Sequence, residues 1–398
     1  MKKQVSLVGR RVADALNRIG KDSVYTARTG DEDTSSVVNG FVSTGCTGLD
    51  YYLGAGAFRG GFPLGRVVEL YGAESAGKST LAIHALISAQ RGHATYLKWK
   101  YEKGLGLSYS VERESTPPGV AVLLDFECSF DRMRAQRMGL DLANLNIVDN
   151  LETLEDGFEA VSSVIDVVNG DKKLQDVPVV VVWDTIAAAA TREEWEAEFG
   201  YARPGGKSVK MFNAMRKLIS RLAKSKVSLI CVNQVIDNIG QHGYGPQTKS
   251  PGGRALKFMA TYRLSAKYIG KVLVGERPIG INTVVQVTKA KLCDPFHELT
   301  VPIRFSTGID DDLATAMFLS DAKRHFPRNE GPISEVKKRF NVKLKSGKVV
   351  SAAIAKRGVT QLFDSYKGLR ARMHRSVRDW WAAQQEPINA SEAGQRAL

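Results

Sequence analysis

The chain has 398 residues, of which 43% are apolar and 25% are charged, and its formal net charge is +14. This balance excludes wholesale disorder and a collagen-like chain, and no uncharged apolar stretch approaches the roughly 20 residues of a membrane helix. The basic first 20 residues lack the continuous apolar segment of a secretory signal. Four widely spaced cysteines form no CxxC pair, which favours reduced thiols. We therefore expect a cytoplasmic protein without membrane contact.

Residues 5–19 carry apolar side chains at near-helical spacing and predict an N-terminal helix, and the polar residues 20–40 predict a linker. From Phe41 onward, apolar β-rich runs alternate with helical stretches, and only a polar connection is indicated between residues 128 and 177. The runs are GRVVELYG (65–72), LAIHALISAQ (81–90), VAVLLDFE (120–127), PVVVVWD (178–184), FNAMRKLISRLAKS (212–225) and VSLICVNQ (227–234). This alternation predicts an α/β fold with a mostly parallel β-sheet flanked by helices. After residue 260, strand-like runs predict hairpins that extend the sheet.

Residues 93–119 interrupt this alternation with a stretch of mixed charge that contains Tyr96, Trp99, Tyr101 and Tyr109. The stretch predicts an inserted hairpin or a long loop. One interpretation is a tolerated surface insertion. The other is a platform for single-stranded nucleic acid, because aromatic side chains interleaved with lysines suit base stacking.

The excess positive charge is concentrated near the C-terminal end of the chain. Residues 323–379 contain sixteen Lys or Arg against four Asp or Glu, which gives +12 of the total +14. A segment this one-sided indicates a polyanionic partner, nucleic acid first. The alternative is a folded cap with solvated charges, whose apolar residues pack on the core: Leu362, Phe363, Tyr366, Trp380 and Trp381.

The most specific local motif is GAESAGKS at residues 72–79, which matches GxxxxGK[ST] between a predicted strand and a predicted helix. Backbone N–H groups of such a loop and the helix N-terminus bind phosphates. Lys78 can reach the β- and γ-phosphates of a nucleotide, and the Ser79 hydroxyl can ligate Mg²⁺. The residues predicted to bind nucleotide here are Gly72, Ala73, Glu74, Ser75, Ala76, Gly77, Lys78, Ser79 and Thr80.

Polar side chains also end three of the predicted buried strands, at the sheet edge where ligands bind. Asp184 ends one strand and suits a water-mediated contact to Mg²⁺. Asp125 and Glu127 end a second strand, and either carboxylate could orient the attacking water. Gln234 ends a third, where it could sense a γ-phosphate or simply be a satisfied polar group.

These pieces, in this order, resemble the RecA family of recombinases over about residues 41–322. The phosphate loop is shared by many families, whereas GGRALKF followed by KAKLCDPF is far more specific. The matching strings are FVSTGCTGLDYYLGAG (41–56), GRVVELYGAESAGKSTLAIHA (65–85), LLDFECSFD (123–131), VVWDTIAA (181–188), NAMRKL (213–218), SLICVNQ (228–234), GGRALKFMATYRL (252–264) and KAKLCDPF (289–296).

The resemblance implies a role for each matching residue. Glu127, rather than Asp125, matches the glutamate that activates the attacking water, and Gln234 matches the γ-phosphate sensor. Lys289 and Lys291 match lysines that reach the ATP of the neighbouring subunit, as an arginine finger would.

At the adenine end of the site, Asp131 matches an acid that contacts the base. Arg134 stands where many members of the family place an aromatic residue, and its guanidinium plane could stack there instead. The insertion at 93–119 and the basic C-terminus also depart from the bacterial pattern, which suggests a divergent member, phage- or plasmid-encoded.

Two Gly- and Pro-rich segments, Glu196–Gly206 and Val235–Gly253, match the loops with which the family holds DNA. The residues expected to contact DNA are Arg203, Lys207, Lys210, Tyr244 and Lys249.

The resemblance implies a DNA-dependent ATPase that uses ATP and Mg²⁺. It would form a helical filament of copies of itself on single-stranded DNA and exchange strands with double-stranded DNA. Residues 1–40 would tether neighbouring subunits, 41–322 would form the ATPase core, and 323–398 would form a small basic α/β domain that gathers duplex DNA. Two rivals are a DnaB-like ring helicase, which would unwind forks without homology, and a non-catalytic DNA-binding filament protein, which would not turn over ATP.

Overall fold

The computed structural model describes residues 37–54, 58–102, 106–197, 205–237, 248–249, 254–321, 333–336, 339–344, 346, 348–353 and 358–379. None of the described helices is both long and apolar enough to cross a membrane. The N-terminal helix predicted over 5–19 lies outside these residues. The elements that form the core are β3 (Val67–Gly72), α3 (Lys78–Gln90), β6 (Val120–Asp125), α4 (Arg132–Met138), β7 (Leu145–Val148), α5 (Leu154–Gly170), β8 (Val179–Asp184), α6 (Arg192–Glu196), α7 (Gly206–Ala223), β9 (Val227–Gln234), α8 (Ala255–Met259), β12 (Tyr262–Val274), β13 (Arg277–Ala290), β14 (Glu298–Arg304), β15 (Gly308–Ile309) and α9 (Asp311–Asp321).

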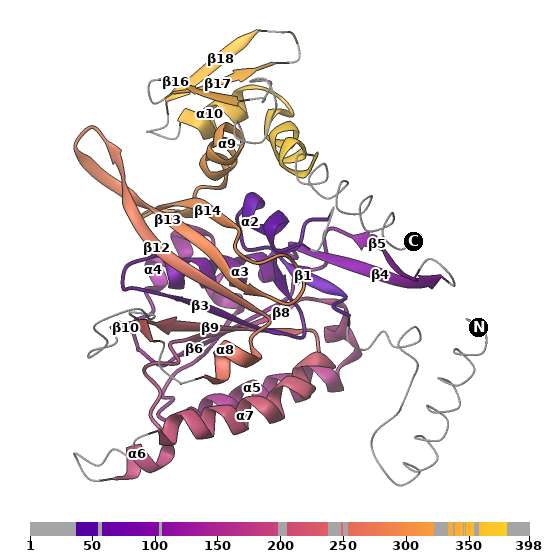
Figure 1. Cartoon of the computed structure of the whole chain (residues 1–398), viewed down its shortest axis with the longest axis vertical. Coiled ribbons are helices and arrows are strands. Elements are labelled where there is room, and N and C mark those ends of the chain that lie inside the picture. Colours follow the sequence, from indigo (N-terminus) through magenta and orange to yellow (C-terminus); the bar gives the residue numbers. More distant parts are fainter. Residues whose placement is uncertain are drawn as a thin grey trace, which may run out of the picture.

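A nine-stranded sheet runs through the described part of the chain in the order β15-β14-β13-β12-β3-β9-β8-β6-β7. The strands from β12 to β7 pair in parallel, whereas β13, β14 and β15 add to one side as antiparallel strands. The long β12–β13 hairpin projects beyond its neighbours (Figure 1). The predictions of a mostly parallel sheet and of hairpins that extend it are both confirmed.

Helices cover both faces of this sheet, as continuously apolar strands require. On one face, Val182 and Ile230 pack in a core cluster with Leu81 of α3. On the other, Trp183 packs with Phe158 of α5, in a cluster that also includes residues of α7 and α8. Because successive residues of a strand point to opposite faces, the sheet fixes which residues can meet the nucleotide helix α3 and which meet α5, α7 and α8.

The prediction of a mere polar connection between residues 128 and 177 is wrong. This stretch forms α4, the edge strand β7 and the 17-residue helix α5. A capping box at the start of α5 pairs Thr153 with Asp156, and apolar residues recur along one face of the helix at Leu154, Phe158 and Val161. Both signals are present in the sequence, but the exposed Asp and Glu residues around them conceal the period.

Residues 93–119 form a hairpin of β4 (Ala94–Glu102) and β5 (Gly106–Arg113) within a separate four-stranded sheet, beside β1 (Gly40–Val42) and β2 (Phe62–Pro63). Tyr96 is buried, and the Trp99 and Tyr109 rings lie 5.3 Å apart, with Tyr109 against Phe58. The Trp99 indole N–H donates to the Val38 carbonyl at 3.0 Å. The expected hairpin is confirmed. Tyr96 is buried, and Trp99 and Tyr109 are half-buried against an apolar cluster, so the packing of these three rings favours a structural role over base stacking.

The C-terminal part contains a three-stranded antiparallel sheet of β16 (Ile333–Val336), β17 (Arg339–Lys343) and β18 (Val349–Ala353), followed by α10 (Gly358–Ser365) and helical residues 369–379. Leu362 and Phe363 are buried in the same cluster as the residues around α3. Their burial supports a folded cap that packs on the core.

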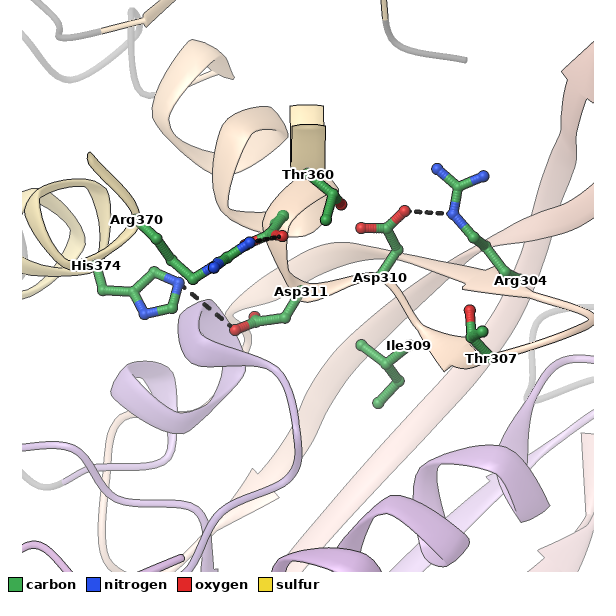
Figure 2. A pocket seen from close by; sticks show the side chains of 9 residues that line it. Arg304, Thr307, Ile309, Asp310, Asp311, Thr360, Arg370 and His374 are labelled. Carbon is green, nitrogen blue, oxygen red and sulfur yellow. Dashed lines mark hydrogen bonds and ion pairs between the residues drawn. The ribbon is translucent and has the colours of Figure 1, made fainter. Parts of the chain in front are cut away.

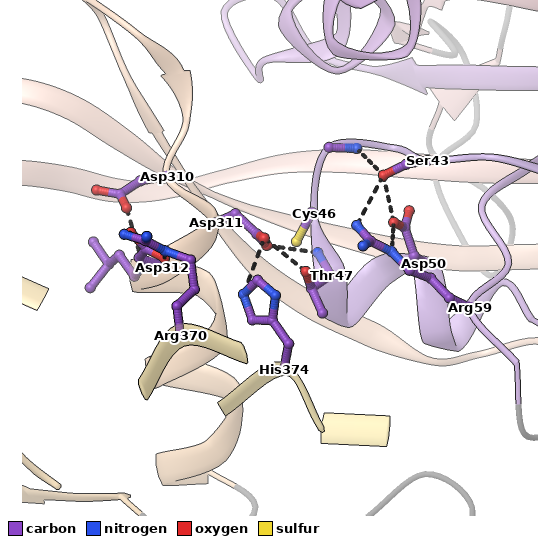
Figure 3. Close-up of polar contacts among 12 residues, drawn as sticks. Ser43, Cys46, Thr47, Asp50, Arg59, Asp310, Asp311, Asp312, Arg370 and His374 are labelled. Atoms are coloured by element: carbon purple, nitrogen blue, oxygen red, sulfur yellow. Dashed lines mark hydrogen bonds and ion pairs between the residues drawn. The ribbon is translucent and has the colours of Figure 1, made fainter. Parts of the chain in front are cut away.

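Ion pairs attach this cap to the start of α9. Arg370 pairs with Asp312 at 2.7 Å, and His374 lies 3.7 Å from Asp311 (Figure 2). These residues line a cavity of about 320 Å³. Asp311 also accepts hydrogen bonds from the backbone N–H and hydroxyl of Thr47, so one carboxylate joins the cap to the first helix of the core (Figure 3).

Trp99→Ala should destabilise the fold without changing affinity for single-stranded DNA, because the half-buried indole packs on Tyr109 and donates to the Val38 carbonyl. We expect a loss of about 2 kcal/mol in the free energy of unfolding, and a melting temperature about 4–8 °C lower. The exposed neighbour Lys98→Ala is the control and should melt as the wild type does. A tenfold loss of DNA affinity in Trp99→Ala at unchanged melting temperature would restore the stacking interpretation.

Candidate nucleotide site

The predicted phosphate loop lies between the end of β3 and the start of α3. Gly77 caps α3 with φ +88°, and an added Cβ there would lie 2.4 Å from a methyl group of Ile303. At Gly72 an added Cβ would lie 2.1 Å from the Ala266 carbonyl oxygen. Glycine is therefore required at both positions, since the backbone conformation or a close neighbour excludes a side chain.

Lys78 is the first residue of α3, and only 7% of its surface is exposed. Its ammonium group donates to the Ala73 carbonyl at 2.6 Å, so the side chain folds back over the loop. Burial lowers the pKa of Lys78, whereas the carboxylates of Asp184, Glu127 and Glu74 act in the opposite direction. The loop thus holds a partly desolvated cation where a phosphate chain would lie.

Asp184 ends β8, and its carboxylate lies beside the Ser79 hydroxyl. Burial raises the pKa of Asp184 to about 6, and the charges of Glu127 and Asp125 act in the same direction. Its Oδ1 is buried and has no hydrogen-bond partner among the described residues. A buried, unpaired carboxylate oxygen beside a serine hydroxyl fits a hard divalent cation such as Mg²⁺, which takes oxygen ligands.

Glu127 and Gln234 follow strands that are far apart in the chain, and they meet in the structure. The Glu127 Oε1 accepts from the Gln234 amide at 3.2 Å and from the Thr185 hydroxyl at 2.8 Å. Asp125 instead accepts from the backbone N–H groups of Ser129 and Phe130, both at 3.3 Å. The geometry therefore separates the two carboxylates: Asp125 holds a turn, and Glu127 is exposed at the site.

Thr185 is a site residue that the sequence analysis missed. It is the residue after Asp184, and its peptide bond to Asp184 is cis. A threonine after a strand carries no motif, so only its contact with Glu127 identifies it.

The residues expected at the adenine end lie next to α3. Asp131 caps α4 by accepting from the Arg134 backbone N–H at 2.9 Å. The Arg134 guanidinium donates to the Thr80 hydroxyl at 3.2 Å. Arg134 is thus held against the first turn of the nucleotide helix, and its stacking on a base stays a prediction.

Lys289 and Lys291 are not brought to this phosphate loop. Lys289 pairs in register with Arg263 of β12, which pairs with Glu69 of β3, three residues before Gly72. At about 3.3 Å per residue along β3 and about 4.8 Å per strand, Lys289 starts more than 10 Å from the loop. Its ammonium group donates to the carbonyls of Lys257 and Phe258, at 2.8 and 2.7 Å.

Desolvation lowers the pKa of Lys289 to about 8, and the cationic neighbours Lys291 and Arg263 act in the same direction. Lys291 is exposed. The pair is a cationic site on the surface of the chain, remote from its own Lys78.

Two of the residues expected to bind DNA are engaged within the chain. The Lys207 ammonium donates to the Ala187 carbonyl at 3.0 Å, and Lys210 pairs with Glu155 at 2.9 Å and Glu193 at 3.2 Å. Both lysines therefore brace the stem of the first loop and would have to release these contacts to reach a phosphate.

The structure describes little of the other residues that were expected to bind DNA. Arg203 and Tyr244 lie outside the described residues. The backbone of Lys249 belongs to β11 (Thr248–Lys249), which pairs with β10 (Ile236–Asp237). This short ladder at the stem of the second loop was not expected from the sequence.

Comparison with known proteins agrees with this geometry. The RecA N-terminal domain profile matches residues 10–113 and 107–310. Protein RecA of Clostridium tetani is 31% identical over 308 residues, which cover 77% of this chain and 76% of that protein. Protein RecA of Chlorobaculum parvum is 35% identical over 292 residues (73% and 72%), and that of Thermus thermophilus is 36% identical over 270 residues (68% of each). The chain belongs to the RecA family.

Proposed function

We propose that the protein is a DNA-dependent ATPase that forms a filament on single-stranded DNA and promotes homologous pairing and strand exchange. The observation that supports this most directly is the convergence of Glu127, Gln234, Asp184 and Ser79 around the loop that holds Lys78. In a RecA family member, this is the set of groups that ATP hydrolysis requires. ATP and Mg²⁺ are its cofactors, and single-stranded DNA, double-stranded DNA and further copies of the chain are its partners.

Each group has a distinct task in this proposal. Lys78 and the loop N–H groups bind the phosphates, and Ser79 and Asp184 hold Mg²⁺, which neutralises phosphate charge when bound. Glu127 is exposed and accepts the proton of the attacking water. Gln234 shares the Glu127 oxygen, so a γ-phosphate that draws the amide away would release the carboxylate for its task.

The position of Lys289 and Lys291 supports a site completed between subunits. They lie too far from the chain's own phosphate loop to act there, yet they are cationic and reach the surface. In a filament they would stabilise the charge that develops on the phosphoryl group of the neighbour's ATP. Residues 1–40 would tether neighbours, and the cap after residue 322 would gather duplex DNA.

The whole proposal is tested by two assays on the full chain. Mg²⁺-dependent ATP turnover should rise with single-stranded DNA, and strand exchange should require homology between the partners. Unwinding of a forked duplex without homology would indicate a helicase instead, and the absence of ATP turnover would remove the enzymatic function.

Glu127→Gln should bind ATP and DNA but hydrolyse ATP about 10²–10⁴-fold more slowly, because it keeps the side-chain shape and loses the base. Single-turnover hydrolysis and nucleotide affinity measure the two effects. The matched control is Asp125→Asn, which should retain most turnover since Asp125 holds a turn. Normal turnover in Glu127→Gln with loss in Asp125→Asn would show that the two carboxylates have been assigned in the wrong order.

Mixtures of two inactive variants test the shared site. Lys289→Ala keeps its phosphate loop but lacks the cation for its neighbour, whereas Lys78→Ala keeps both surface lysines. Co-assembled mixtures should regain part of the DNA-stimulated ATP turnover that neither variant has alone. If mixtures shown to co-assemble regain none, the site is not completed by the neighbouring subunit.

Charge reversal on the cap tests duplex capture. The exposed residues Lys348, Lys367 and Arg375 changed together to Glu should weaken duplex binding and leave turnover stimulated by single-stranded DNA intact. The slope of log K against log salt should become shallower by about 0.9 for each phosphate that the variant no longer neutralises. A control with the same charge change elsewhere reverses three exposed lysines: Lys172, Lys173 and Lys224. Equal duplex affinity and salt slope in both variants would exclude the cap as the duplex-binding element.

A further inference from the structure

A carboxylate is buried in the middle of the central sheet. Glu69 lies on β3 with 1% of its surface exposed, between the apolar residues Val68 and Leu70. An isolated charge at such a depth is strongly unfavourable. Both oxygens of Glu69 are engaged: Oε1 accepts from the Asn233 side-chain amide at 3.0 Å, and Oε2 accepts from Nε of Arg263.

The two partners of Glu69 lie on either side of the second predicted DNA loop. Asn233 is the residue before Gln234 on β9, and Arg263 lies on β12, directly after α8. The Asn233 Oδ1 also accepts from the Gln234 backbone N–H at 3.1 Å. One carboxylate therefore joins the strand that enters the loop to the strand that follows it.

The same row of residues continues to the surface lysine. Lys289 of β13, Arg263 of β12 and Glu69 of β3 are neighbours in register across three strands. The ammonium group of Lys289 rests on two carbonyls at the end of α8, the helix that follows the loop. Side-chain contacts of Glu69 thus join β9, β3 and β12, and Lys289 of β13 lies beside Arg263 in register.

Packing restrains the middle of the row. The Arg263 guanidinium lies 4.4 Å from the centre of the Tyr71 ring, and the Tyr71 hydroxyl donates to the Thr288 hydroxyl at 2.9 Å. Thr288 in turn donates to the Arg263 carbonyl at 3.0 Å. Because a satisfied polar network is rigid and its bonds strengthen one another, a change at one member is expected to affect the others.

We propose that Glu69 is a positioning residue that couples Gln234, the stems of the second DNA loop and Lys289 into one unit. This inference rests on the proposed function, because it takes Gln234 and Lys289 as groups that meet ATP. Through Glu69, contact of Gln234 with a γ-phosphate would change the conformation of the loop stems and the position of the Lys289 ammonium group that faces the neighbouring subunit. Such coupling requires a network whose arrangement depends on both Gln234 and Lys289. Glu69 is placed to join them, because it contacts Asn233 next to Gln234 and Arg263 next to Lys289.

The first experiment uses Glu69→Gln, which keeps the side-chain shape and removes the charge. ATP affinity without DNA should stay within about twofold, since Glu69 does not contact the phosphate loop. The stimulation of ATP turnover by single-stranded DNA should fall about tenfold. Full stimulation in a folded Glu69→Gln variant would overturn the proposal.

The pH dependence of kcat/KM provides a readout that a purely structural role would not move. The groups that face Lys289 are Lys291 on its own strand, Arg263, Glu69 and the α8 carbonyls, and of the charged groups among them only Glu69 raises the pKa of Lys289. Removing the Glu69 charge lowers that pKa below about 8, so the loss of kcat/KM at high pH should begin at lower pH. Lys289→Arg in the Glu69→Gln chain should abolish that shift, because a guanidinium stays protonated. An unshifted profile would count against the proposal.

A matched control separates positioning from stability. Asp50 of α2 (Thr47–Tyr52) is also a fully buried carboxylate, held by Ser43, Thr44 and Arg59. Asp50→Asn should lower the melting temperature without changing DNA stimulation or the pH profile. If it reduces stimulation as much as Glu69→Gln does at an equal decrease in melting temperature, Glu69 has only a structural role.

Two further measurements keep the inference testable independently of the proposed function. Hydrogen exchange in Glu69→Gln should accelerate at both stems, residues 231–237 and 254–263, relative to Asp50→Asn, whether or not DNA stimulates the wild type. Acceleration at neither stem, or at one only, would overturn the inference. If Glu69→Gln does not fold, Asn233→Ser replaces it, because this variant leaves the Glu69–Arg263 pair intact. Asn233→Ser is expected to show the same loss of DNA stimulation, and full stimulation in this variant would refute the coupling.

Discussion

The strands from β12 to β7 run in the same direction, so their carboxyl ends meet at one edge of the sheet, and the central strands β3, β9 and β8 are buried on both faces. This constraint positions the polar groups that lie at the ends of the strands around the phosphate loop. Asp184, Glu127 and Gln234 follow strands that are separate in sequence and adjacent in the sheet. The apolar faces hold the strands in register, and the register decides which polar side chains can meet.

The charges of Lys78 and Asp184 at this edge are not fully compensated by other groups of the described chain. Lys78 faces Asp184 and Glu127, and burial disfavours the charged forms of both Lys78 and Asp184. A nucleotide phosphate opposite Lys78 and a divalent cation opposite Asp184 would each supply the missing partner. This arrangement supports the proposal that the site binds both together, in a chain that belongs to the RecA family.

Outside this edge, carboxylate side chains join elements of the fold through ion pairs and hydrogen bonds, and two of them join segments that lie far apart in the sequence. Glu69 links β3 to β9 and β12, Asp311 links α9 to Thr47, and Arg304 pairs with Asp310. Such pairs fix the relative positions of elements more than they stabilise the fold, since desolvation offsets much of their attraction.

The sequence by itself determined the phosphate loop, the parallel core and the family, because these depend on local spacing and on continuous apolar runs. It did not reveal α5, because charged residues interrupt the apolar period of this helix. It also did not reveal the packing of Trp99 against an apolar cluster, because the local sequence of a packed tryptophan does not differ from that of an exposed one. The different contacts of Asp125 and Glu127, the contact of Thr185 and the burial of Glu69 are visible only in the tertiary structure. These features depend on which side chains the fold brings next to each residue. Strand order and register decide this, and neither can be read from a single segment of the sequence.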